Sequence, residues 1–464
     1  MSDDLHTLTI AEAAERITAR QLSPVELTDA LLDRIARVDP QVRAYVHVDS
    51  EGARRRAREA EAEIAAGDRR GPLHGIPVAL KDIYDTADMP TTCHSHVFAE
   101  RRPDVDAETT ARLRAAGAVL LGKLATHEFA FGGPSWDTPF PPARNPWNGE
   151  HFTGGSSSGS GAAMAAGLAL GTLGSDTAGS IRMPAHFCGV AGLKPTYGLV
   201  SRRGVSPLAY SLDHCGPLTW TTRDAALMLD AIAGHDPADP ASATRDPAAF
   251  TAALDGNVRG LRIGVIRHFY ERDLAAGADM VAAMEAAIAT LAELGAEIET
   301  VELSPLQEYH ACNFVIMLGE AVAIHEADLQ ATPERYGEIM RDRLYAGALF
   351  SAADYVQATR LRRVLVEEMA HAFERFDVLI TAGGAGPAPK LDAMSKFYVF
   401  EKPLITSPFD VAGNPALGVR AGFSRDGLPL GLQIAGRPFE DATVLRVGDA
   451  FERATPWPEH RPAL

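Results

Sequence analysis

Short apolar segments that alternate with longer helical stretches are the feature that most constrains how this 464-residue chain can fold. Strand-like segments are expected at residues 76–80, 118–121, 261–266, 378–380, 416–419 and 430–434. Helical spacing is found over residues 23–38, 51–66, 106–116, 277–294 and 440–453. Strands and helices that alternate in this way predict a mixed sheet sandwiched by helices. The expected class is therefore α/β, an α/β/α sandwich with a large mixed central sheet covered by helices.

The sequence predicts a single domain over residues 1–464, since no repeat and no clean boundary interrupts it. An N-terminal helical layer is expected over about residues 8–70. A core that carries the chemistry should follow over about 71–235. A C-terminal helical and strand part, over about 259–460, is expected to shape the substrate pocket.

Composition narrows the partners and the compartment. Hydrophobic residues make up 46% of the chain and charged residues 23%, which is typical of a globular protein with a sizeable core. The net charge of −17 disfavours direct contact with nucleic acid. No stretch of about 18 apolar residues predicts a membrane span, and the N-terminus lacks the pattern of a signal peptide. The four cysteines form no Cys-x-x-Cys pair, so we expect a reducing, cytoplasmic location.

Four motifs with known chemistry are rejected, because each is incomplete, absent or placed in the wrong surroundings. Gly117–Lys123 matches most of a phosphate-binding loop, but Leu124 stands where a hydroxyl should reach Mg²⁺. Gly155–Gly159 fits a nucleophile elbow, but no buried strand precedes it, which argues against an α/β-hydrolase. No serine has a lysine three residues later, so a Ser-x-x-Lys site is excluded. Cys93–His96 lacks a second pair at ligand spacing, so no metal site is expected.

The stretch from Thr153 to Lys194 carries the strongest functional signal. Small residues dominate both of its ends, and an apolar, helix-like run separates them. Glycines permit the tight turns and the close backbone approach that the floor of an active site needs. A flexible loop followed by a buried Ala/Gly helix would account for the first segment. It would not account for the second polar turn, Ser175–Arg182.

This stretch closely resembles the amidase signature sequence, and the resemblance continues on both sides of it over about residues 10–460. The matching blocks are Gly75–Asp82, His127–Gly132, Arg144–Trp147, Gly192–Thr196, Gly216–Leu218, Asn414–Ala416 and Gly431–Gly436. The chain is also similar to the A subunit of glutamine-dependent aminoacyl-tRNA amidotransferase, particularly over residues 192–230.

The resemblance implies three catalytic residues: Lys81, Ser156 and Ser180. In the family, the residue at Ser180 attacks the amide carbonyl and forms an acyl-enzyme. Ser156 would relay the proton of that hydroxyl to Lys81, which accepts it only if burial lowers the lysine pKa. The family holds the bridging serine in a cis peptide, here Gly155–Ser156.

The resemblance also implies the surroundings of these residues. Backbone N–H groups of Thr177, Ala178, Gly179 and Ser180 are expected to form the oxyanion hole. Asp176 and Arg182 should pair and hold the loop, with Ser157 and Ser175 as hydrogen-bond partners around the catalytic groups. Substrate is expected to contact Phe129, Phe131 and Gly132, next to the helical region 305–375 and the turn 381–387. No metal or organic cofactor is implied.

The leading expectation is an amidase that hydrolyses the carboxamide C–N bond of a small-molecule substrate through an acyl-enzyme on Ser180. Carbamates and biuret-like ureas are further substrates of such enzymes. One alternative is the glutaminase (A) subunit of a tRNA-dependent amidotransferase or a similar multi-subunit assembly. Another is a catalytically inactive binding member. The expected partner is a small-molecule amide, without nucleic acid or membrane, and a homodimer is compatible with the family.

Overall fold

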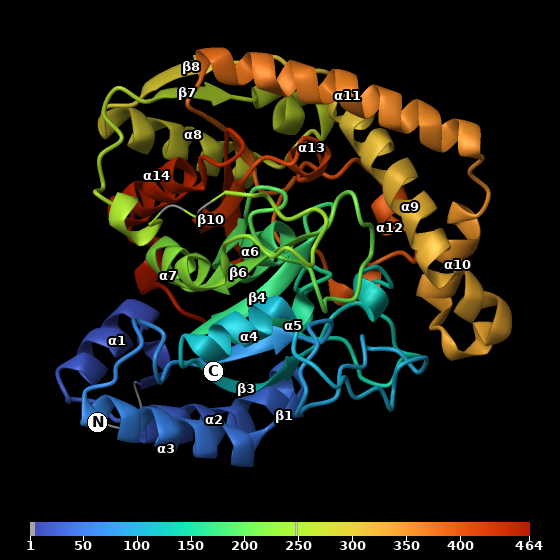
Figure 1. Ribbon diagram of the computed structural model, residues 1–464. Helices are drawn as coiled ribbons and strands as arrows, with labels where there is room; N and C mark the ends of the chain where they lie inside the picture. Colours follow the sequence, from blue (N-terminus) through green and yellow to red (C-terminus); the bar gives the residue numbers. More distant parts are fainter. Residues whose placement is uncertain (1–4, 246, 248) are drawn as a thin grey trace.

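A single mixed sheet organises the molecule. The computed structural model describes residues 5–245, 247 and 249–464. Its strands form an eleven-stranded sheet in the order β1-β3-β2-β4-β6-β5-β10-β11-β9-β7-β8 (Figure 1). They are β1 (Tyr45–Val48), β2 (Pro77–Lys81), β3 (Val119–Leu124), β4 (Gly171–Asp176), β5 (Ala191–Lys194), β6 (His214–Thr219), β7 (Arg262–Val265), β8 (Glu297–Thr300), β9 (Val378–Ala382), β10 (Ala416–Phe423) and β11 (Pro429–Gly436). β2 runs parallel to β3 and β4, and β7 runs parallel to β8 and β9, while the other neighbouring pairs are antiparallel.

Helices cover both faces of this sheet. They are α1 (Ile10–Thr18), α2 (Pro24–Val42), α3 (Ser50–Ala66), α4 (Glu108–Ala115), α5 (Ser158–Ala165), α6 (Arg182–Cys188), α7 (Thr222–Ile232), α8 (Ala278–Glu293), α9 (Leu306–Ala331), α10 (Glu338–Gly347), α11 (Ala352–Arg375), α12 (Tyr398–Glu401), α13 (Ser407–Val411) and α14 (Asp441–Arg453). In β4, the Cα of Gly171 faces Met228 of α7, whereas the Thr172 hydroxyl bonds to Ser160 of α5. Side chains alternate along a strand, so α7 and α5 lie on opposite faces. The expected α/β fold with a mixed, helix-covered sheet is confirmed.

The small residues of the signature stretch are required by close packing. All eight residues of α5 are buried, so this helix has no solvent face. A Cβ on Gly159 would lie 2.4 Å from the Ala44 carbonyl oxygen and 2.5 Å from the Ala125 nitrogen. These neighbours are backbone atoms, which cannot move aside as a flexible side chain can. The run of Ala, Gly and Ser therefore allows α5 to lie directly against the chain and to bring its N-terminus to the ends of β2 and β4.

Five strands differ from the sequence-based expectation: β1, β4, β5, β6 and β8 lie where no strand is predicted. β4 is the most consequential of them. Its sequence, GTLGSD, is poor in the β-branched and aromatic residues that favour strands. It becomes a strand because it pairs with β2 on one side and β6 on the other, and all six of its residues are buried.

Within the described residues, no helix is both long and apolar enough to cross a membrane.

The packing around α5 gives a test of the fold. Gly159→Ala should lower the free energy of unfolding by about 1–3 kcal/mol, because the new methyl group overpacks a site walled by backbone. Gly149→Ala is the matched control, since no atom of the described residues lies within 4 Å of a Cβ at that position. Thermal unfolding of both variants beside the parent protein makes the comparison. Equal midpoints for the two variants would contradict this description of the α5 packing.

Candidate active site

A buried lysine and two hydroxyl groups meet where β2 and β4 end. Lys81 is the last residue of β2, and Ser175 is the next to last residue of the adjacent parallel strand β4. The Lys81 side chain is fully buried. Its Nζ donates to the Ser156 Oγ at 2.7 Å and to the Ser175 Oγ at 2.8 Å. The sheet therefore aims one amine at two hydroxyls that come from different segments.

Burial sets the protonation of this amine. Removal from water lowers the pKa of Lys81 to about 7, against a weaker opposite effect of the Asp176 and Asp213 carboxylates. No carboxylate oxygen lies within 4.0 Å of its Nζ among the described residues. A lysine in this setting exchanges a proton near neutral pH, which an ordinary lysine does not do.

The segment 154–158 brings the Ser156 hydroxyl to Lys81. The peptide bond between Gly155 and Ser156 is cis. The Ser156 carbonyl accepts from the His127 N–H at 3.0 Å, and the Ser157 N–H donates to the Ser180 carbonyl at 3.2 Å. The Ser157 hydroxyl bonds to the backbone N–H and C=O of Ser175. Ser157 thus ties the segment that carries Ser156 both to β4 and to Ser180.

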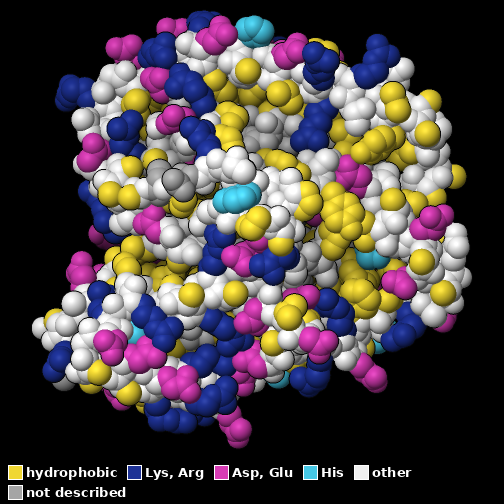
Figure 2. Space-filling model, viewed as in Figure 1, with side chains coloured by type: hydrophobic (Ala, Val, Ile, Leu, Met, Phe, Trp, Pro, Cys, Tyr) yellow, Lys and Arg dark blue, Asp and Glu magenta, His cyan; other side chains and the backbone are white. Residues whose placement is uncertain are grey.

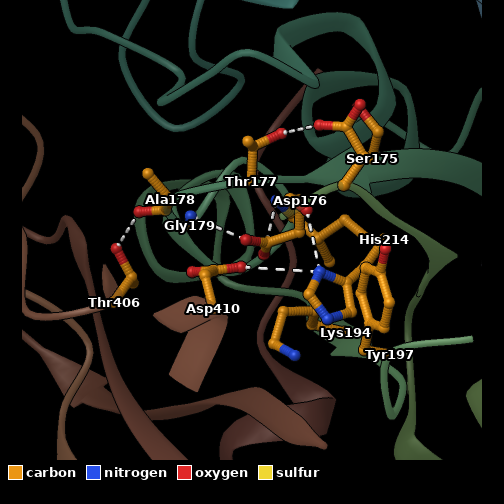
Figure 3. Close-up of polar contacts among 12 residues, drawn as sticks. Ser175, Asp176, Thr177, Ala178, Gly179, Lys194, Tyr197, His214, Thr406 and Asp410 are labelled. Carbon is orange, nitrogen blue, oxygen red and sulfur yellow. Dashed lines mark hydrogen bonds and ion pairs between the residues drawn. The ribbon is translucent and has the colours of Figure 1, made fainter. Parts of the chain in front are cut away.

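The loop between β4 and α6 is held by the Asp176 carboxylate (Figure 3). This carboxylate accepts from the backbone N–H of Gly179 at 2.6 Å, of Ile181 at 3.0 Å and of Arg182 at 3.3 Å. Gly179 has a φ of +123°, and a Cβ there would lie 2.1 Å from the Thr406 hydroxyl oxygen. Thr406 in turn donates to the Ala178 carbonyl at 2.5 Å. Ser180 lies half-buried at the end of this loop and lines the same cavity as Ser156.

A fully buried ion network fixes the loop from behind. The Arg182 guanidinium donates to Asp176 at 2.9 Å and to Asp410 at 2.5 Å. Burial acts to raise the pKa of Asp176, but Arg182 outweighs it and holds that pKa below its ordinary value. Burial, together with the charge of Asp176, raises the pKa of Asp410 well above its ordinary value. His214 faces the same pair, with its Nδ1 at 3.2 Å from the Asp176 carbonyl oxygen (Figure 3).

The cavity above Ser180 is small and mostly apolar. Its volume is about 30 Å³, and its walls include Ser156, Ser180, Phe131, Phe314, Tyr398 and Arg343. Phe131 therefore lies where the sequence places a substrate contact. Phe129 does not line this cavity but packs edge-on against Phe98 and His325. Gly132 lies in the adjoining turn, where a Cβ would meet the Glu128 Cβ at 2.8 Å.

Arg343 is a pocket residue that was not predicted from the sequence. Its guanidinium is buried between the rings of Phe131 and Tyr398, with centroid distances of 5.1 and 5.2 Å. It donates to the carbonyls of Phe131 and Lys396, and no carboxylate pairs with it among the described residues. Burial lowers its pKa to about 10, so it remains a cation at neutral pH. Nothing in the local sequence distinguishes this arginine from Arg341 of the same helix.

Comparison with known proteins decides the family. The family model described as "Amidase" matches residues 26–445. The chain belongs to the amidase family. As an amidase-family enzyme, it acts on carbon–nitrogen bonds, and the resemblance identified from its sequence is confirmed.

The relatives of this amidase-family chain include components of a larger enzyme. The A subunit of glutamyl-tRNA(Gln) amidotransferase from Roseiflexus sp. (strain RS-1) is 41% identical over an alignment of 485 positions that covers 99% of this chain and 99% of that one. The solved A subunit of the same enzyme from Thermotoga maritima is 33% identical, with a TM-score of 0.83, over 98% of this chain and 96% of that one. The native peptide amidase from Stenotrophomonas maltophilia is also 33% identical, with a TM-score of 0.86, over 98% of both chains.

These relatives correct two expectations. The leading expectation of a small-molecule carboxamide hydrolase is wrong, because relatives at 39–42% identity over 98–99% of the chain are tRNA amidotransferase A subunits. The expected absence of nucleic acid, with a small molecule as the only partner, is wrong for the same reason.

The physical error lies in treating a net charge of −17 as a statement about partners. Net charge describes the average surface of one chain. It does not show whether an assembly that contains the chain contacts nucleic acid. On the face shown in Figure 2, basic and acidic side chains are interspersed, so the charge of the whole chain does not describe each local surface.

The ion network in this amidase-family enzyme gives a second test. Arg182→Met should lower the free energy of unfolding by about 3–5 kcal/mol, because it leaves two buried carboxyl groups without their cation. Asp410→Asn should cost less than half of that, since Arg182 keeps Asp176 as its partner. Denaturant unfolding of the two variants compares them. A larger loss for Asp410→Asn would show that Arg182 is not the centre of the network.

Proposed function

We propose that this chain is the glutaminase subunit of a glutamyl-tRNA(Gln) amidotransferase, releasing ammonia from glutamine for a partner subunit that amidates the tRNA-bound glutamate. The observation that carries this proposal is the full-length match to A subunits, at 39–42% identity over 98–99% of this chain. In this proposal, tRNA and partner subunits belong to the working assembly. The four free cysteines of this chain, all buried, fit the reducing cytoplasm in which aminoacyl-tRNA is used.

The chemistry we propose starts at Ser180. Its Oγ attacks the side-chain amide carbonyl of glutamine, and its proton passes through the Ser156 hydroxyl to neutral Lys81. The C–N bond then breaks, the nitrogen takes the proton back from Lys81 through Ser156, and ammonia leaves a γ-glutamyl ester on Ser180. Water attacks this ester by the same relay and releases glutamate. The 2.7 Å contact between Lys81 and Ser156 supports this path for the proton.

The negative charge on the attacked oxygen requires backbone donors. The N–H groups of Ala178 and Ser180 have no acceptor among the described residues and are the donors that we propose, with Thr177 beside them. The Gly179 N–H is already donated to Asp176 at 2.6 Å, so it serves the loop instead. Asp176 and Arg182 would keep these amides in place during the reaction, and Ser157 and Ser175 would hold Ser156 and Lys81.

The pocket walls fit an amino-acid amide. Arg343 is a buried cation without a carboxylate partner among the described residues, and we propose that it attracts the α-carboxylate of glutamine. Phe131 and Tyr398 would contact the methylene groups of the same substrate. Tyr398 and Val399 line one side of the small cavity above Ser180, where we propose that the substrate enters.

Ammonia release tests the proposal. Wild-type protein, assembled with the partner subunits of the same enzyme, should hydrolyse glutamine, and Ser180→Ala should lower kcat by more than about a thousandfold because it removes the nucleophile. Ser395→Ala, at an exposed serine, is the matched control and should keep full activity. Turnover of glutamine by Ser180→Ala would refute the assigned nucleophile. Failure of the wild-type assembly to release ammonia would refute the function.

The pKa of Lys81 predicts how the reaction depends on pH. The proposed base works only when neutral, and its pKa of about 7 means that it becomes protonated as the pH falls below that value. The rate should therefore drop roughly tenfold per unit below about pH 7 and level off above it. The rate at which a fluorophosphonate labels Ser180, followed from about pH 5 to about pH 9, reports this directly. A rate that stays flat down to about pH 5 would exclude Lys81 as the base.

A further inference from the structure

We propose that Glu128 is a positioning residue that fastens the N-terminus of α10 to the pocket loop and so places Arg343 for the substrate. The inference rests on the proposed function for its choice of glutamine as the probe. Glu128 itself touches none of the reacting groups, and its effect on the substrate runs through α10.

Glu128 is a buried carboxyl group with two fixed partners. Only 1% of the residue is exposed. Its Oε2 accepts from the Gly337 N–H at 2.9 Å, and its Oε1 accepts from the Ser95 hydroxyl at 2.5 Å. Gly337 is the residue directly before α10, and a Cβ there would lie 2.9 Å from the same Oε2. The Glu128 carboxylate therefore packs directly against Gly337, at the start of α10.

The Glu128 carboxyl group is buried and, within the described part of the chain, has no cationic partner, which is energetically unfavourable for its charged form. No Lys, Arg or His nitrogen lies within 4.0 Å of it among the described residues. Burial raises the pKa of Glu128 to about 7, which measures the cost of removing the charge from water. The first turn of α10 offsets part of this cost, because free N–H groups and the helix dipole favour a negative group. An apolar side chain would avoid the cost but could not accept the Gly337 N–H.

A second fastening joins the same loop to the same helix. Three residues after Glu128, the Phe131 carbonyl accepts from the Arg343 Nη1 at 2.5 Å. Between the two contacts, Phe129 and Ala130 have φ values of +46° and +62°, so the loop turns sharply enough to meet α10 twice. The other end of the loop meets the catalytic segment, since the His127 N–H donates to the Ser156 carbonyl. Glu128 thus sets the distance between the segment that carries Ser156 and the helix that carries Arg343.

Three substitutions separate this role from general destabilisation. Glu128→Ala removes the acceptor, and Glu128→Asp keeps the charge but shortens the side chain by one methylene group, so it does not reach Gly337. Glu128→Gln keeps both the length and an oxygen acceptor and should rescue. Asp137→Asn is the matched control, because Asp137 accepts from the next N–H of the same helix, that of Glu338, but from an exposed position.

The experiment measures KM and kcat for glutamine in the assembled enzyme, and hydrogen–deuterium exchange over residues 336–347 in the full chain. We expect Glu128→Ala and Glu128→Asp to raise KM roughly tenfold with a much smaller change in kcat, and to speed exchange at the start of α10. Glu128→Gln and Asp137→Asn should stay within about twofold of wild type in KM. Fluorophosphonate labelling of Ser180 should remain unchanged in all four.

Each possible result either supports or overturns the positioning role of Glu128. Unchanged KM and exchange in both Glu128→Ala and Glu128→Asp would overturn it, as would an equal effect of Asp137→Asn. A fall in kcat with constant KM would also overturn it, since Glu128 would then act on the chemistry. If wild-type enzyme consumes no glutamine, the proposed function fails. The exchange measurement then decides about Glu128 alone: faster exchange in the Ala and Asp variants but not in the Gln variant supports the fastening.

Discussion

The Asp176 carboxylate, buried beside the Arg182 guanidinium, is the interaction on which the rest of the site depends. It accepts from three backbone N–H groups of the loop between β4 and α6 and so fixes the path of the chain up to Ser180. Arg182 extends this hold to Asp410 and the Thr406 carbonyl, more than 220 residues further along the chain. A buried charge network of this kind is costly to break, so the segment that carries Thr406 and Asp410 stays fixed against the loop that carries Ser180.

Lys81, Lys123 and Lys194 are all fully buried, and only one of them suits the role of a base. Lys123 lies 3.3 Å from the Asp82 carboxylate and also donates to carbonyls, and the Asp82 charge opposes the lowering of the Lys123 pKa by burial. Lys194 donates to the carbonyls of Pro195 and Asn414, and burial lowers its pKa to about 8. Among the described residues, the Lys81 amine forms hydrogen bonds only to hydroxyl groups, which tolerate either protonation state. Burial without a paired carboxylate or carbonyl is therefore what distinguishes Lys81 from the other two.

The sequence predicted the class of fold and the residues that meet at the site, but not the surroundings of the site. β2 was predicted because its apolar residues read as a buried strand, whereas β4 was missed because GTLGSD becomes a strand only through its neighbours. Asp410, Thr406 and Arg343 reach the site from distant segments, and no local pattern marks them. The resemblance to a family supplied Lys81, Ser156 and Ser180. The expectation of a free-standing small-molecule amidase was wrong because the same three residues are implied for the amidotransferase A subunits, so they do not distinguish the two functions.

Peptide mapping by mass spectrometry after rapid acid quench of the assembled enzyme with glutamine tests the central claim most directly. We predict a γ-glutamyl adduct on the peptide that contains Ser180, with no adduct on the peptide that contains Ser156. Hydroxylamine added before the quench should remove the adduct, because it attacks an ester. Ammonia release without an adduct on Ser180, or an adduct on another residue, would contradict the account.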